Sequence, residues 1–311
     1  MEQTGIRSST YHGHDARILT AGDVEAVLLP ALGMLCASLK LRGEEFLGRT
    51  DELDQYVERG STIGIPLLHP WANRVESFLF EAAGRSVLLE RNSPLLHYDA
   101  NGLPMHGVPG AKLEWTILEE EADGRAASLT ARLPWMRLEL LEIFPYPHWL
   151  EMTAEVDAGG LTLTTALIPR GDIAVPIAFG YHPYLRLPGV PRSQWTLELP
   201  PMRRLMLDER MIPNGVEQLF SWNNGPLGDV SFDHAFRLTQ HHPRFTISAG
   251  ERHITVAFLE GFTYAQIYAP LDRDFVAIEP MTAPGNALVT NYGLRAVVPG
   301  ATFRATFRIE L

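Results

Sequence analysis

Every second residue is apolar in the C-terminal run of residues 303–311, from Phe303 to Leu311. A period of two is typical of a β-strand with one buried and one exposed face. Similar runs recur along the chain and are separated by turns that contain glycine or proline. We predict strands over residues 24–29, 34–41, 112–118, 126–133, 137–144, 149–156, 161–168, 246–248, 253–259, 264–268, 275–278, 294–298 and 303–311.

Helical patterns are scarce by comparison, and the one modest candidate covers residues 50–58. The charged segment 119–125, which contains Asp123-Gly124, predicts the turn of a hairpin. Many short strands without an alternation of strands and helices favour an all-β fold, a large antiparallel β-sandwich or a barrel. No linker, shift in composition or internal repeat divides the chain, so we expect residues 1–311 to form a single domain.

The charge of the chain limits the partners that it can have. The net charge is −11 at pH 7, whereas nucleic acid and anionic membranes bind clusters of Lys and Arg, so we expect neither as a partner. No apolar stretch approaches the ~20 residues of a membrane helix. Residues 1–10 lack the apolar segment of a signal peptide, and we expect a cytoplasmic protein. The single cysteine, Cys36, lies in an apolar run and is expected to be a small buried hydrophobe.

Several segments break the strand pattern and concentrate polar side chains beside glycine and proline, where functional loops are common. Residues 64–75 include Asn73-Arg74, and arginine offers a planar fork of donors for hydroxyls or carboxylates. The alternative is an arginine that only ties down its loop. Residues 101–107 end in His106-Gly107, where the glycine lets a ligand approach closely. The alternative there is a surface histidine in a turn.

His182 lies between Tyr181 and Tyr184 and directly before a proline. The proline restricts the preceding residue to an extended conformation, which fixes the direction of the histidine ring, and the flanking aromatic rings suit the apolar face of a sugar. Glu279 ends the apolar strand predicted at 275–278. A carboxylate at the end of a buried strand is partly desolvated, which raises its pKa toward that of a useful base. The competing interpretations are a satisfied buried histidine and a surface glutamate.

Two weaker candidates are Asp233, which lies with a histidine between phenylalanines, and Gln266, a polar residue within a predicted strand. Either could instead be a surface residue. The remaining histidines do not have the spacing of a zinc site. The chain has no glycine-rich phosphate loop and no nucleophile elbow. We therefore expect neither a metal nor a cofactor.

Taken in order, the motifs Asn-Arg, His-Gly, His-Pro-Tyr, Asp-x-x-Phe and Glu-Pro resemble those of the aldose 1-epimerase (galactose mutarotase) family, from about residue 31 to the C-terminus. The resemblance implies a large β-supersandwich and a cofactor-free interconversion of the α and β anomers of a monosaccharide. Residues 181–185 read Tyr-His-Pro-Tyr-Leu where the family typically has Asn-His-x-Tyr-Phe, and Val108 replaces the glycine that usually comes second after His106. These departures leave the identity of the sugar open.

The resemblance also implies a role for each candidate residue. His182 would be the general acid and Glu279 the general base, and His106 would assist at the sugar ring or bind a hydroxyl. The residues that would hold the sugar hydroxyls are Asn73, Arg74, Asp233 and Gln266.

The chemistry of a cyclic hemiacetal requires an acid and a base together. Glu279 as a carboxylate would take the proton of the anomeric hydroxyl, while His182 as an imidazolium would protonate the ring oxygen. Rotation about C1–C2 and reclosure then give the other anomer. Each positioned proton transfer is worth roughly 10²–10⁴ in rate. We therefore expect an isomerase, an aldose 1-epimerase acting on an aldohexose, as a monomer or homodimer.

Three alternatives stay open. The substrate could be an anionic sugar, such as a hexose 6-phosphate or a sulfosugar, with Arg170 and Arg186 as the anion partners. The chain could also be a non-catalytic carbohydrate-binding protein, although a binder would not need both His182 and Glu279. A glycoside hydrolase would need a second carboxylate, for which Asp233 is the candidate.

Overall fold

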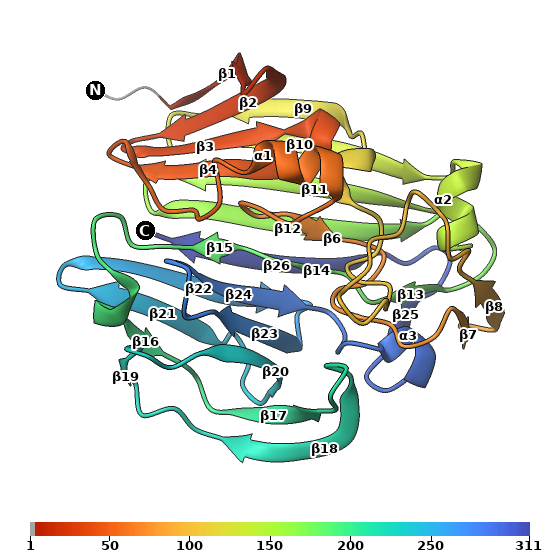
Figure 1. Ribbon diagram of the computed structural model, residues 1–311. Helices are drawn as coiled ribbons and strands as arrows, with labels where there is room; N and C mark the ends of the chain where they lie inside the picture. The colour runs from red at the N-terminus through yellow and green to blue at the C-terminus, as the bar shows by residue number, and fades with distance from the viewer. Residues whose placement is uncertain (1–3) are drawn as a thin grey trace.

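The computed structural model describes residues 4–311, and strands make up most of it (Figure 1). The prediction of an all-β fold is confirmed. Neighbouring strands pair antiparallel in two large sheets, one smaller sheet and two two-stranded pairs. Across residues 4–311, no helix has the length and apolar character needed to cross a membrane.

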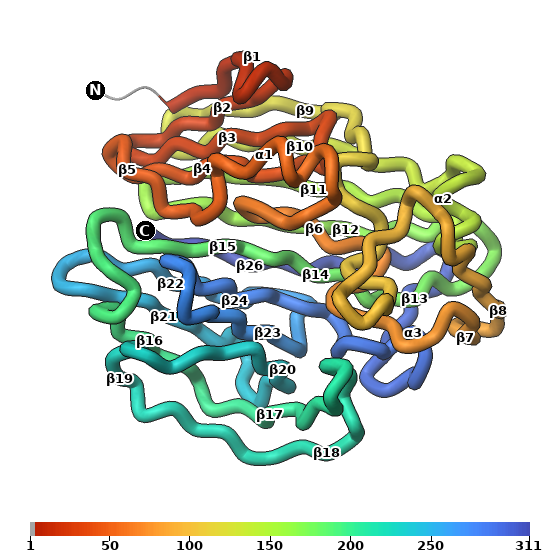
Figure 2. Tube along the Cα trace, in the orientation of Figure 1, coloured from red at the N-terminus to blue at the C-terminus, as the bar shows by residue number. Residues whose placement is uncertain are grey.

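The largest sheet has nine strands and forms one layer of the molecule. In spatial order they are β19 (Gly225–Pro226), β16 (Thr196–Glu198), β21 (Arg244–Ala249), β22 (Arg252–Glu260), β26 (Phe303–Glu310), β12 (Gly160–Pro169), β11 (His148–Asp157), β10 (Ala126–Trp135) and β9 (Thr116–Ala122). Figure 2 shows the C-terminal strand β26 running inside this sheet, while the N-terminal strands lie at one edge of the molecule.

Two further sheets cover this layer. The five-stranded sheet consists of β1 (Gly5–Tyr11), β2 (His14–Ala21), β3 (Val24–Leu29), β4 (Leu35–Leu41) and β5 (Glu44–Glu45), and it packs on β10 and β11. The eight-stranded sheet consists of β18 (Pro213–Phe220), β17 (Met202–Leu207), β20 (Phe232–Leu238), β23 (Tyr264–Ala269), β24 (Val276–Met281), β14 (Gly180–Tyr181) and β6 (Leu67–Leu68), with β15 (Tyr184–Leu185) also paired to β24.

Short elements complete the fold. The two-stranded pairs are β7 (Leu79–Ala82) with β8 (Arg85–Leu88) and β13 (Val175–Ile177) with β25 (Arg295–Val297). The helices are α1 (Leu53–Arg59), α2 (Leu138–Ile143) and α3 (Ala287–Thr290), and the 3₁₀ turns are η1 (Pro30–Leu32), η2 (Gly110–Lys112) and η3 (Arg192–Gln194). Helix α1 confirms the helix predicted at 50–58, shifted by a few residues.

Two predictions of strands are wrong in whole or in part. Residues 112–118 were predicted as one strand, but Lys112 belongs to η2 and β9 begins only at Thr116. Residues 137–144 were expected to be extended, but they contain helix α2. Leu140 and Ile143, three positions apart, are buried, whereas Leu138 is exposed. This spacing is that of one helical face, not of a strand.

The turn predicted at 119–125 is only partly correct. Strand β9 continues to Ala122, and the chain turns at Asp123-Gly124, where the Asp123 carboxylate accepts hydrogen bonds from the backbone N–H groups of Arg125 and Ala126. The glutamates of β9 are tolerated because β9 is an edge strand with one face in water.

The two large sheets share one buried cluster of apolar side chains. Phe307 from β26 and Tyr181 from β14 meet with ring centroids 5.0 Å apart, and both side chains are almost completely buried. The Tyr181 hydroxyl is hydrogen-bonded to Thr165 of β12. The alternation predicted for the C-terminal run is confirmed, because Phe307 and Ile309 face this core while Arg304 is exposed.

Phe307→Ala should lower the free energy of unfolding by about 3–5 kcal/mol, since it leaves a cavity where the sheets meet. Arg304→Ala on the same strand should change it by less than about 0.5 kcal/mol. Urea denaturation of both variants measures the difference. A loss below about 1 kcal/mol for Phe307→Ala would show that the sheets do not depend on this contact.

Candidate active site

A cavity of about 320 Å³ opens beside β24, β23 and β20 of the eight-stranded sheet. Its size lies at the small end of the range for small-molecule sites, roughly 300–1,000 Å³, and suits one small ligand. All the site residues predicted from the sequence line it, namely Asn73, Arg74, His106, His182, Asp233, Gln266 and Glu279. The structure therefore brings together residues that lie more than 200 positions apart in the chain.

Sheet register explains how four of the lining side chains come to share one face. Glu279 of β24 is paired with Gln266 of β23, and Asp233 of β20 is paired with Tyr268 of β23. Paired residues on antiparallel strands point to the same face, as do residues two positions apart on one strand. All four therefore point to the cavity, while the intervening Ile267 points into the core.

His182 and Glu279 form a direct contact at the cavity. The Nε2 atom of His182 lies 3.2 Å from Oε1 of Glu279, and the two residues are only 6% and 2% exposed. The prediction that Glu279 ends its strand is wrong, because β24 continues to Met281. Every residue of β24 is buried, so the strand has no polar face from which its true length could have been inferred.

Burial shifts both pKa values of this pair away from the charged forms. Desolvation raises the pKa of Glu279 well above its ordinary value, with a further increase from Asp233 and an opposing effect of Arg74. Desolvation lowers the pKa of His182 to about 3, opposed by its own backbone carbonyl and reinforced by Arg49. Both shifts favour the uncharged forms, a protonated carboxyl on Glu279 beside a neutral imidazole on His182.

The ring of His182 packs against a tyrosine. The ring of Tyr184 stacks on it with centroids 4.3 Å apart and an angle of 21° between the planes. The Tyr184 hydroxyl lies 2.6 Å from Oγ1 of Thr62 and accepts a hydrogen bond from Nη1 of Arg49 at 3.3 Å. Of the two tyrosines expected to face a sugar, only Tyr184 lines the cavity, since Tyr181 packs in the core.

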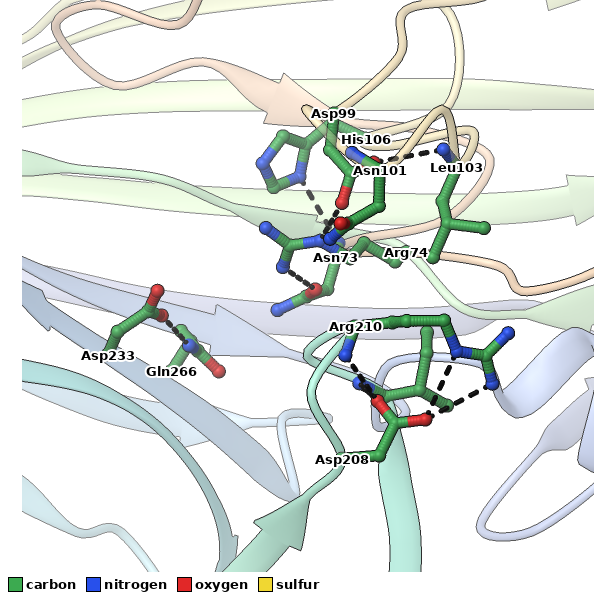
Figure 3. A network of polar contacts seen from close by, with 11 residues as sticks. Asn73, Arg74, Asp99, Asn101, Leu103, His106, Asp208, Arg210, Asp233 and Gln266 are labelled. Atoms are coloured by element: carbon green, nitrogen blue, oxygen red, sulfur yellow. Dashed lines mark hydrogen bonds and ion pairs between the residues drawn. The ribbon is translucent and has the colours of Figure 1, made fainter.

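Asn73, Arg74 and His106 are joined by a compact set of hydrogen bonds (Figure 3). The backbone N–H of Asn73 donates to Nδ1 of His106 at 3.1 Å, and the backbone N–H of His106 donates to the carbonyl of Asn73 at 2.9 Å. Because Nδ1 accepts, a neutral His106 carries its proton on Nε2 and can donate it to a ligand. Burial lowers the pKa of His106 well below its usual value, which keeps the ring neutral.

Arg74 is oriented by a carboxylate behind it. Its Nε donates to Oδ2 of Asp99 at 2.6 Å and its Nη1 to Oδ1 of Asn73 at 3.0 Å. Asp99 is itself fixed by the backbone N–H groups of Asn101 and Leu103, both at 2.9 Å. The guanidinium points to the side on which Asp233 and Gln266 lie (Figure 3), so its remaining donors can face a ligand.

The opposite wall supplies acceptors. Nε2 of Gln266 donates to Oδ1 of Asp233 at 2.5 Å, and both residues line the cavity. Oε1 of Gln266 is left as a free acceptor among the residues that the structure describes. Within residues 4–311, neither this oxygen nor Oε2 of Glu279 has a hydrogen-bond partner, although both are buried. Buried acceptors without partners are costly, and the hydroxyl groups of a ligand would satisfy them.

The sequence did not reveal several residues of the cavity wall, and two arginines that it suggested as partners of an anion lie elsewhere. The missed residues include Arg49, Thr62, His97, Met105 and Tyr268. Arg49 and Thr62 flank helix α1 beside Gly48 and Gly60, a polar, glycine-containing setting that could have marked them.

Arg170 and Arg186, expected as partners of an anion, do not line the cavity. The guanidinium of Arg170 lies over the ring of Trp149 at 3.9 Å, and the exposed Arg186 donates from Nε to the carbonyl of Glu45 at 3.2 Å. Arg49 and Arg74 are the arginines of the cavity wall. Over residues 4–311, no group of three or more His, Cys, Asp or Glu side chains has an arrangement that could hold a metal ion.

The raised pKa of Glu279 makes a prediction about stability. The pKa of Glu279 lies well above its ordinary value in the folded protein, whereas the unfolded chain ionises this carboxyl above about pH 4.5. Its contribution to stability is therefore complete below that pH and is lost as the pH rises toward the folded-state pKa. Glu279→Gln, which mimics the protonated form, should gain stability over the parent protein progressively as the pH rises above about 5.

Urea unfolding at several pH values measures this trend, with Glu198→Gln as a control on an exposed strand position. The control should show no comparable trend. If the stability of the Glu279→Gln variant fell relative to that of the parent protein as the pH rose, Glu279 would be ionised in the folded protein.

The sequence matches the profile of the aldose 1-epimerase family over residues 19–310. Among curated proteins, the uncharacterized protein YihR of Escherichia coli K12 is 24% identical over 261 residues, which cover 79% of this chain and 80% of YihR. Solved structures with the same fold include a galactose mutarotase-like protein from Clostridium acetobutylicum, with a TM-score of 0.86, 18% identity and coverage of 99% of this chain and 98% of that one.

A second solved structure, galactose 1-epimerase from Lactobacillus acidophilus, superimposes with a TM-score of 0.73 at 14% identity, covering 99% of this chain and 98% of that one. At these identities the structural likeness establishes the galactose mutarotase-like fold. The match to the family profile spans nearly the whole chain and includes every residue of the cavity wall named above. The chain belongs to the aldose 1-epimerase family.

Proposed function

We propose that this protein is a mutarotase that interconverts the α and β anomers of a neutral aldohexose by acid/base ring opening. The contact of 3.2 Å between His182 and Glu279, buried in a cavity lined by hydroxyl-binding groups, is the observation that carries the proposal. A hemiacetal must lose a proton at the anomeric hydroxyl and gain one at the ring oxygen. Those two oxygens share one carbon, so the acid and the base must be neighbours.

The proton count of the pair suits this reaction. The resting pair, with a protonated Glu279 and a neutral His182, becomes reactive when the proton crosses from Oε1 to Nε2. Glu279 can then take the anomeric proton while His182 gives a proton to the ring oxygen, and the C1–O5 bond breaks as the C1=O bond forms. The open-chain sugar then faces a neutral pair again, and the reverse transfers close the ring on either face of the carbonyl.

Burial drives these transfers in the productive direction. The ionised pair is the form that desolvation disfavours, so its carboxylate is a strong base and its imidazolium a strong acid. Ring opening returns both residues to the uncharged forms that the cavity favours. Hydrogen bonds from the sugar and the charge of Arg74 offset part of the cost of ionising Glu279.

The remaining wall residues would hold the sugar while it opens. Arg74 and the Nε2–H of His106 are donors, and Asp233, Gln266 and Asn73 offer acceptors to hydroxyl groups. Held in this way, the opened chain can rotate about C1–C2 without leaving the pair, which is the positioning that such a reaction needs.

The charges of the cavity favour a neutral sugar over an anionic one. Arg49 is already paired with Glu52 at 2.8 Å and Arg74 with Asp99 at 2.6 Å. An anionic group would have to compete with these carboxylates and would also face Asp233. Single-domain organisation, a cytoplasmic location and a monomeric or homodimeric state stay predictions from the sequence.

Glu279→Gln should reduce the acceleration of anomer exchange by at least about 10²-fold, because the amide cannot take a proton. Exchange is followed by polarimetry or by exchange NMR on freshly dissolved α-anomers of several aldohexoses, with Glu198→Gln as the surface control. The control should keep full activity. An equally active Glu279→Gln variant would rule out Glu279 as the base, and saturable sugar binding without any exchange by the parent protein would point to a binding protein.

Hexoses should be converted with a higher kcat/KM than the matching hexose 6-phosphates or sulfosugars, since no arginine of the cavity wall lacks a carboxylate partner. Arg186→Ala should leave both values unchanged because Arg186 lies outside the cavity. A tenfold or greater preference for the anionic sugar would reverse the assignment of the substrate class.

A further inference from the structure

Asn286 connects the segment that follows Glu279 to the segment that carries Arg74. Its backbone N–H donates to the carbonyl of Arg74 at 2.7 Å. Its Oδ1 accepts from the backbone N–H of Glu76 at 3.0 Å, and its Nδ2 donates to Oε1 of Glu76 at 2.8 Å. Asn286 is 2% exposed, while the side chain of Glu76 is 31% exposed. The three bonds connect Asn286 to the chain on both sides of Val75.

The position of Asn286 in the chain makes this use of its side chain notable. It directly precedes helix α3, where an asparagine ordinarily accepts a hydrogen bond from the first turn of its own helix. It makes no such bond, and both ends of its amide are directed to Glu76 instead. Its φ of 66° lies in the left-handed region, which asparagine tolerates better than most residues.

The same segment also lies beside Asn73. A Cβ placed on Gly285 would be in ordinary van der Waals contact with Asn73, 3.4 Å from its Cβ, and Oδ1 of Asn73 accepts a hydrogen bond from Nη1 of Arg74. On the outer side, Oε2 of Glu76 accepts from Nη2 of Arg210 at 2.9 Å, and Arg210 is held in turn by Asp208. Arg210 is partly exposed, so this outer link is the weaker one.

We infer that Asn286 is a positioning residue for Arg74. By tying the loop after β24 to residues 74–76, it holds the hydroxyl-binding guanidinium in a fixed relation to Glu279 on β24. The inference rests on the proposed role of Arg74 in holding the sugar. It assigns to Asn286 no contact with the sugar, as Asn286 is not part of the cavity wall.

Asn286→Gly tests this directly. Glycine keeps the left-handed backbone and the N–H bond to Arg74 but removes both bonds to Glu76. The Kd and KM for D-glucose and D-galactose should rise about tenfold, because the variant loses one hydrogen bond to a carboxylate and one from a backbone N–H, while kcat falls less. Sugar binding is measured by calorimetry or NMR titration, independently of turnover.

Asn291→Gly is the matched control. Asn291 lies at the other end of α3, also with a left-handed φ, of 58°, and is exposed. This variant should bind sugar like the parent protein. Glu76→Ala removes the carboxylate that accepts from Nδ2 of Asn286 and keeps the backbone N–H that donates to its Oδ1. If Asn286→Gly does not fold, Glu76→Ala should reproduce part of the loss of affinity.

A double-mutant cycle with Arg74→Ala shows whether Asn286 acts through Arg74. The Asn286→Gly change should cost about tenfold in Kd with Arg74 present and less than about twofold in the Arg74→Ala background. Equal losses in both backgrounds, or no loss in either, would overturn the inference. If the parent protein binds sugar without exchanging its anomers, the proposed function is rejected, and the double-mutant cycle still tests the role of Asn286. If the parent protein binds no sugar at all, both the proposed function and the role of Asn286 are overturned.

Discussion

The contact between His182 and Glu279 is the interaction around which the rest of this site is arranged. Two ionisable side chains touch at 3.2 Å in a place where neither is well solvated. Such a pair is expensive to charge and inexpensive to keep neutral with one proton between its members. When the scaffold holds this pair in its ionised form, Glu279 is therefore a strong base and His182 a strong acid.

The sheets, the loops and the polar wall serve this pair in different ways. The register of β20, β23 and β24 sets Asp233, Gln266 and Glu279 on one face of a sheet. The segment from Asn73 to His106 supplies donors on the facing wall. The hydrogen bonds between Asn286 and Glu76 join the loop after β24 to that segment, and in this way they hold the donors at a fixed distance from the base.

The sequence predicted what depends on local pattern. The alternation in residues 303–311 identified β26 and its buried face, and motifs beside glycine and proline identified four segments that contribute side chains to the cavity. The true extent of β24 could not be inferred, because a strand that is buried on both faces and carries a glutamate has no alternation. Helix α2 was predicted as a strand, because a six-residue helix offers too few turns for its period to stand out from an apolar run.

What the sequence could not supply was the pairing of charges across the fold. Arg186 lies close to the His182 motif in the chain, yet neither it nor Arg170 lines the cavity, whereas Arg49 reaches it from beside α1. The partners Asp99 and Glu52, which decide how much charge each arginine offers a ligand, lie in loops without a recognisable motif. Likewise, only the tertiary structure determines that the side chain of Asn286 binds Glu76 and not the first turn of α3.

The state of the shared proton is the most direct test of this account. Nitrogen-15 NMR of the His182 ring and carbon-13 NMR of the Glu279 carboxyl, both in the sugar-free protein near neutral pH, report it without turnover. The account predicts a neutral imidazole beside a protonated carboxyl, the state that desolvation favours. A resting imidazolium beside a carboxylate would contradict it, since burial would then not be what sets the strength of the acid and the base.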